Sequence, residues 1–214
     1  MNKIPVKGIL LGNTGVGKTS FCSSYREAYK EDQNSTATAL CSTFNMNGIP
    51  GSENHTFQLW DTAGQEQFKS LASNYIRDAD IVFIFTACEE TIEKQNEDDK
   101  QFEDYILKVY DQLSEGSFYP AFVLNKTDLM NSTELTAREE KIKAKVNEII
   151  KGISGATLPT SIQFFSISCK QSLNIEETFI EGFKQGCAIR DKKPVPNASN
   201  PPEPRPDNRC CLIQ

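Results

Sequence analysis

Positions 12–20 read GNTGVGKTS, which places three glycines close together with a lysine and two hydroxyl side chains at the end. The spacing Gly12-x-x-x-x-Gly17-Lys18-Thr19 is that of a phosphate-binding loop. Glycines let consecutive backbone N–H groups turn inward around an anion, and a following helix presents its positive end to that anion. A lysine here reaches the outer phosphates of a nucleotide, and the hydroxyl beside it is a ligand for Mg²⁺. The loop therefore predicts a nucleotide site that uses Mg²⁺.

A second motif, NKTD at 125–128, indicates which base the nucleotide carries. It directly follows a predicted strand, so it lies at a carboxyl end of the sheet, where α/β folds bind ligands. The carboxylate of Asp128 can accept both the N1–H and the N2 amine of guanine, and adenine lacks that pair of donors. Alone the motif is weak, but its position about a hundred residues after a phosphate loop makes it a strong indication of guanine.

Two further predicted strands end in polar residues, DTAGQE at 61–66 and SCK at 168–170. Asp61 can hold Mg²⁺ through water, the N–H of Gly64 can approach a γ-phosphate, and Gln65 can orient the attacking water. This chemistry is hydrolysis of GTP to GDP and phosphate. Gln65 is its candidate catalytic residue.

Taken together, these motifs resemble the small GTPases of the Ras superfamily. LWDTAGQEQFKSL at 59–71 and NYIRDAD at 74–80 are most similar to the Rab branch. The resemblance covers about residues 5–190 and implies a set of nucleotide contacts: Gly15, Val16, Gly17, Lys18, Thr19, Ser20, Tyr29, Thr36, Gly64, Asn125, Lys126, Asp128, Ser168, Cys169 and Lys170. It also implies Mg²⁺ bound by Thr19, by Thr36 and, through water, by Asp61.

In this chain, the segment that carries the metal-binding threonine, the first switch, departs from the family's usual pattern. Tyr29 and Thr36 have the family's seven-residue separation, whereas Thr38 has its usual distance to Asp61. We favour Thr36 as the switch threonine, because a longer loop at 45–54 absorbs two extra residues cheaply. Thr38, or no metal-binding threonine at all, remains an alternative.

The family's surface patch of three aromatic side chains is also incomplete. Trp60 and Tyr75 match two of the positions, and the third falls on Cys41 in the Thr36 register or on Thr43 in the other. Because a missing aromatic removes a large anchor, ordinary Rab partners are expected to bind poorly.

The strand near the base differs as well. Phe85 and Thr86 stand where the family commonly has tyrosine and aspartate, and the acidic stretch 89–99 is slightly lengthened. We interpret that stretch as a solvated junction between loop and helix rather than as a binding site.

Short apolar runs alternate with segments of helical periodicity, which predicts a six-stranded, mostly parallel sheet with helices on both faces. The fold class is thus α/β, and the resemblance to small GTPases implies that it is the P-loop NTPase G domain. Strands are predicted at 6–11, 39–44, 56–60, 80–86, 121–124 and 162–167, and helices at 20–29, from 102 to 113, at 135–150 and at 174–189.

Composition divides the chain into a G domain, 1–190, and a flexible tail, 191–214, with six prolines between 191 and 209. The tail ends Cys210-Cys211-Leu-Ile-Gln, a prenylation pattern that anchors a protein to membranes. Its last residue suggests farnesyl, whereas Rab proteins commonly carry geranylgeranyl on both cysteines. A net charge of −6 argues against nucleic-acid partners. The apolar run 81–85 is too short to span a membrane.

The main interpretation is a Rab-like switch in vesicle-mediated transport that binds and slowly hydrolyses GTP. It is expected to be monomeric and to use an exchange factor, a GTPase-activating protein and effectors. Its expected place is the cytoplasmic face of an intracellular or plasma membrane, with a cytosolic pool. The alternatives are a farnesylated Ras-type signalling GTPase and a nucleotide-binding module with little hydrolysis.

Overall fold

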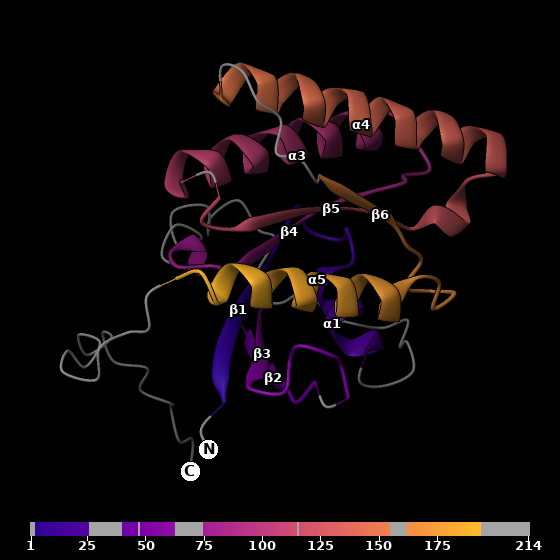
Figure 1. The fold of residues 1–214 in the computed structure, drawn as a ribbon. Helices are drawn as coiled ribbons and strands as arrows, with labels where there is room; N and C mark the ends of the chain where they lie inside the picture. The colour runs from indigo at the N-terminus through magenta and orange to yellow at the C-terminus, as the bar shows by residue number, and fades with distance from the viewer. Residues whose placement is uncertain are drawn as a thin grey trace, which may run out of the picture.

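The computed structural model describes residues 3–25, 40–46, 48–62, 75–114, 116–154 and 162–193. They build a six-stranded sheet in the order β2-β3-β1-β4-β5-β6 (Figure 1). Only β2 runs antiparallel to its neighbour among the described strand pairs. The strands are β1 (Ile4–Leu11), β2 (Leu40–Phe44), β3 (His55–Asp61), β4 (Ile81–Ala87), β5 (Tyr119–Asn125) and β6 (Gln163–Ser166).

Helices cover both faces of this sheet. Figure 1 shows α3 and α4 on one side and α1 and α5 on the other. Their bounds are α1 (Lys18–Ser24), α3 (Ile92–Gln112), α4 (Ser132–Ser154) and α5 (Ile175–Arg190), and a short 3₁₀ turn, η2, spans Thr127–Leu129. This arrangement confirms the predicted fold class.

The alternating residues of β1 supply two separate cores. Val6 and Leu10 pack into the core beneath α1 and α5, whose centre includes Phe179. Ile9 and Leu11 point to the other face and join the core beneath α3 and α4. Strands buried on both faces read as nearly continuous apolar runs, which is why β4 and β5 stood out in the sequence. The sheet is thus held rigidly from both sides, and its carboxyl edge is a fixed platform.

All six predicted strands are present, and their bounds shift by up to two residues. The helix predicted from position 102 begins ten residues earlier, at Ile92, after Thr91, whose hydroxyl accepts the N–H of Lys94. Much of the acidic stretch 89–99 is exposed, as expected, but Asp98 is 4% exposed. The solvated interpretation is therefore wrong at Asp98, because this carboxylate turns inward towards the end of β4.

Helix α5 ends in a cluster of ion pairs at the amino end of β4. The carboxylate of Asp80 is fully buried and accepts hydrogen bonds from Arg190, from the Nζ of Lys193 and from the backbone N–H of Lys7. The contacts of the domain therefore continue to Lys193. Within the described part of the chain, no helix combines the length and apolar character needed to cross a bilayer.

Gly182 of α5 provides a test of this packing. A Cβ at this position would lie 2.3 Å from Cζ of Phe83, which is fully buried and cannot yield. We expect Gly182→Ala to lower the free energy of unfolding by about 1–3 kcal/mol in urea titrations. Gly152→Ala is the matched control, because a Cβ there meets no atom within 4 Å, and it should stabilise the protein by about 0.5–1 kcal/mol. Stabilisation by both substitutions would contradict the close contact of α5 with the sheet.

Candidate functional site

The loop between β1 and α1 bends at glycines that have no room for a side chain. Gly12 and Gly17 have φ values of 147° and 98°, in the region that favours glycine. A Cβ on Gly12 would lie 2.7 Å from the carbonyl oxygen of Phe85. A Cβ on Gly17 would lie 2.1 Å from Nδ2 of Asn125. The ends of β4 and β5 therefore press against this loop and set its shape.

The ammonium group of Lys18 lies inside the loop. Its Nζ donates to the carbonyl oxygens of Gly12 and Asn13, both at 2.8 Å, and the residue is 5% exposed. Burial lowers the pKa of Lys18 to about 8, and the carboxylates of Asp61 and Asp98 oppose that shift. Among the described residues Lys18 forms no ion pair, so a phosphate enclosed by the loop would supply its counter-charge.

An oxygen-rich pair lies beside the loop, where β1 and β3 run next to each other. The hydroxyl of Thr19 donates to Oδ2 of Asp61 at 2.7 Å. Asp61 ends β3, is 3% exposed and lies opposite Leu10 in the strand register. A hydroxyl and a carboxylate are the hard oxygen ligands that suit Mg²⁺. The two residues predicted from separate motifs are thus brought together in a form that fits this ion.

The amide side chain of Asn125 joins the phosphate loop to the other loops of the site. Its Nδ2 donates to the carbonyl oxygen of Val16 at 2.7 Å, and its Oδ1 accepts the N–H of Cys169 at 3.2 Å. Its backbone oxygen accepts the N–H of Cys88 at 2.8 Å. Asn125 is 2% exposed, so these bonds also satisfy an amide that would be costly to bury alone.

The NKTD and SCK motifs meet through Asp128 and Ser168. The Ser168 hydroxyl donates to Oδ1 of Asp128 at 2.5 Å and accepts the N–H of Gln171 at 3.1 Å. A carboxylate has four lone-pair sites, so Asp128 retains acceptor capacity for a base. Burial raises the pKa of the Cys169 thiol to about 12, which keeps it protonated and lets it act as a small apolar group.

The other predicted contacts are distributed around the loop. Gly15 lies at its tip with φ 81°, where an added Cβ would meet nothing within 4 Å. The Val16 side chain is 1% exposed and belongs to the core, so only its backbone faces the site. Ser20 is half-buried in α1, and Lys170 is exposed. Several predicted residues lie outside the described part of the chain: Tyr29, Thr36, Thr38, Gly64, Gln65, Cys210 and Cys211.

The two predicted surface aromatics are in contact. The rings of Trp60 and Tyr75 have centroids 5.6 Å apart, and both residues are half-buried. Across the β2–β3 ladder, Cys41 lies opposite Trp60, whereas Thr43 lies opposite Gln58. The exposed Cys41 is therefore the position adjacent to the aromatic pair.

Sequence reasoning missed a buried polar cluster at the end of β4. Oδ2 of Asp98 accepts the Thr86 hydroxyl at 2.6 Å and the N–H of Ala87 at 2.9 Å. Arg138, 5% exposed, reaches the same place from α4 and pairs with Asp99. Burial raises the pKa of Asp98. A usable signal was Thr86 itself, because a hydroxyl in an otherwise apolar strand requires a partner.

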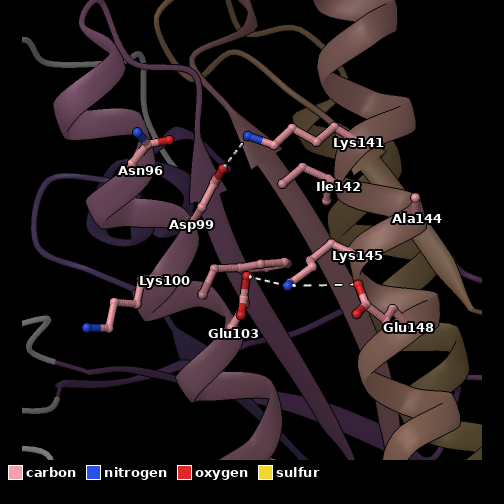
Figure 2. Close-up of a pocket in the computed structure, with 10 residues that line it drawn as sticks. Asn96, Asp99, Lys100, Glu103, Lys141, Ile142, Ala144, Lys145 and Glu148 are labelled. Carbon is pink, nitrogen blue, oxygen red and sulfur yellow. Dashed lines mark hydrogen bonds and ion pairs between the residues drawn. The ribbon is translucent and has the colours of Figure 1, made fainter.

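A cavity of about 490 Å³ lies elsewhere, between α3 and α4. Figure 2 shows its walls bridged by two ion pairs, from Lys141 to Asp99 and from Lys145 to Glu103. Lys145 also pairs with Glu148 within α4. No residue of the phosphate loop, NKTD or SCK lines this cavity. The convergent polar groups at the carboxyl edge of the sheet therefore define the candidate site better than cavity size does.

Comparison with known proteins agrees with this geometry. The sequence model of the Ras family matches residues 7–187. The chain is 33% identical to Ras-related protein RABG1 of Arabidopsis thaliana, over 85% of this chain and 82% of the relative. It is 30% identical to the Ypt/Rab-type GTPase YPT7 of Saccharomyces cerevisiae, over 82% and 78% of the two chains. It is 27% identical to Ras-related protein Rab-7a of Dictyostelium discoideum, over 98% of both. The chain therefore belongs to the Ras family, as a Rab-like small GTPase of vesicle trafficking.

Proposed function

We propose that the carboxyl edge of the sheet binds GTP and GDP, with the phosphates in the loop 12–17 and guanine between NKTD and SCK. The bond from Nδ2 of Asn125 to the carbonyl oxygen of Val16 carries this proposal, because it joins the phosphate loop to the motif that selects the base. Lys18 supplies positive charge to the phosphates. Asp128 accepts the two guanine donors, and the Ser168 hydroxyl orients its carboxylate.

Mg²⁺ is the proposed metal partner. Thr19 and Asp61 would hold it, Asp61 through water, because their oxygen atoms already lie 2.7 Å apart beside the phosphate loop. When bound, the ion neutralises charge on the β- and γ-phosphate oxygens. Thr36 is the proposed third protein ligand. The position of Cys41 opposite Trp60 supports this choice, since Cys41 is the third patch residue in the Thr36 register.

Hydrolysis is proposed to depend on positioning, with Gln65 orienting the attacking water and Gly64 and Thr36 responding to the γ-phosphate. Arg138 and Arg190 are paired with Asp99 and Asp80, respectively. Neither is therefore available to stabilise the transition state. We expect slow intrinsic turnover that a GTPase-activating protein accelerates, together with an exchange factor and effectors that read the switch loops.

Membrane attachment is proposed to occur through prenyl groups on Cys210 and Cys211, with the protein otherwise monomeric and partly cytosolic. The fold supports this geometry. Arg190 and Lys193 are held by Asp80 at the amino end of β4, the edge opposite the phosphate loop. A tail that starts there leaves the nucleotide edge open to partners at the cytoplasmic face of the membrane.

The pKa of Lys18 makes nucleotide binding depend on pH. Binding needs the charged ammonium group, which is present below its pKa of about 8 in the protein without nucleotide and is lost above it. We expect GDP affinity in the presence of Mg²⁺ to fall by up to about twofold between pH 7 and 8 and by up to about tenfold between pH 7 and 9. Fluorescence titration with labelled GDP measures this.

The control for that measurement is Lys18→Ala, which removes the titrating group. It should weaken GDP binding by at least about a hundredfold, because charge-assisted bonds to phosphate are lost. The GDP affinity of this variant should also lose its dependence on pH, because the titrating group is gone. A variant that binds GDP as tightly as the wild type would show that Lys18 does not contact phosphate.

Single-turnover hydrolysis tests the proposed reaction. The wild-type chain loaded with GTP should release phosphate slowly, and Gln65→Leu should retain GTP while slowing that release at least about tenfold, since the side chain orients water without holding nucleotide. Gln67→Leu is the control, because it makes the same substitution two residues further along the chain. Equal rates for the wild type and Gln65→Leu would remove Gln65 from the mechanism. No phosphate release from any form would favour a binding module without hydrolysis.

A further inference from the structure

The loop that follows β4 is bonded to the side chain of Lys126. We propose that Glu89 is a positioning residue that holds Lys126 against bound guanine nucleotide and so slows its release. This inference rests on the proposed guanine site, in which Lys126 is one of the base-contacting residues.

The contact itself is short and sheltered. Nζ of Lys126 donates to Oε1 of Glu89 at 2.6 Å, and the two side chains are 30% and 17% exposed. The backbone of Lys126 is left-handed, with φ 60° and ψ 35°, which directs the start of its side chain. One end of the side chain is thus set by the backbone and the other by Glu89, so its methylene stem has few remaining conformations.

Glu89 is itself held by neighbouring elements. Its N–H donates to Oε1 of Gln95 in α3 at 3.1 Å, and Nε2 of Gln95 donates to the carbonyl oxygen of Ala87 at 3.0 Å. The N–H of the adjacent Cys88 donates to the backbone oxygen of Asn125 at 2.8 Å. The loop is therefore attached to α3 on one side and to the start of NKTD on the other.

The end of β4 is fixed more deeply by the polar cluster of Asp98, Thr86 and Arg138. Asp98 bonds both the Thr86 hydroxyl and the N–H of Ala87, and Nη2 of Arg138 reaches the same hydroxyl at 3.3 Å. Arg138 is balanced by Asp99. Such a buried network is rigid when its members are bonded. The carboxylate of Glu89 is thus presented from a rigid support rather than from a mobile loop.

Preorganisation of this kind changes nucleotide release. A lysine side chain has many rotamers, and ordering it against a ligand has an entropic cost. A carboxylate that orders Lys126 in advance reduces that cost, so the bound nucleotide should dissociate more slowly. An exposed ion pair would contribute little, but this pair is partly buried and its carboxylate is anchored. The neighbouring Glu90 is exposed and forms no ion pair among the described residues.

The experiment is a double-mutant cycle on GDP release from the full-length protein. Fluorescent GDP is loaded with Mg²⁺ and chased with excess GDP, using the wild type, Glu89→Gln, Lys126→Met and the double variant. We expect Glu89→Gln to speed release by about three- to tenfold. In the Lys126→Met background, which already releases GDP faster, Glu89→Gln should add no further acceleration. Glu90→Gln removes the same charge one residue away and should release GDP at the wild-type rate.

The outcomes separate this inference from the proposal on which it rests. If Lys126→Met speeds release and Glu89→Gln does not, the positioning role is overturned and the guanine site stands. If the accelerations of GDP release by the two substitutions multiply in the double variant, Glu89 acts through the fold and not through Lys126. That outcome also overturns the positioning role. If Lys126→Met itself releases GDP at the wild-type rate, the guanine site is misassigned and both proposals fail.

Discussion

The geometry of the site depends on the hydrogen bonds of Asn125. Its amide joins the phosphate loop at Val16 to the loop after β6 at Cys169. Its backbone oxygen accepts the N–H of Cys88, in the loop after β4. Only glycine fits at position 17, because a Cβ there would lie 2.1 Å from that amide. Since Asn125 is buried, loss of any partner would leave a polar group unsatisfied. The separation between the phosphate end and the base end of the site is therefore set by one side chain.

Strands β4 and β5 were predictable because each is a short apolar run, and β3 because buried residues alternate with half-buried ones along it. Periodicity worked less well for α3, whose first half is polar and begins at Ile92 without an apolar stripe. Its start depends on the hydroxyl of Thr91 as a cap and on the inward turn of Asp98. A polar segment of this kind has the same sequence pattern as a solvated loop. The burial of Asp98 could therefore not be predicted from the pattern.

The site motifs were predictable because their chemistry is local. Lys18, Asn125 and Asp128 each occur within a few residues of the glycine turn or strand end that places them. The contacts that were missed join residues far apart in the chain. Thr86 reaches Arg138 across 52 positions, and Glu89 reaches Lys126 across 37. Neither pair forms a motif, and only the pairing of β4 with β5 and the packing of α3 against α4 bring them together.

One edge of the sheet is proposed to recognise guanine through Asp128, and the direct test is to exchange its carboxylate for an amide. Competition binding would compare GDP with xanthosine diphosphate on the wild type and on Asp128→Asn. An amide accepts from one donor and itself donates, so we expect the affinity for GDP to fall by about tenfold to a hundredfold and the affinity for the xanthine nucleotide to rise. Undiminished preference for GDP in Asp128→Asn would contradict the assignment of the base site.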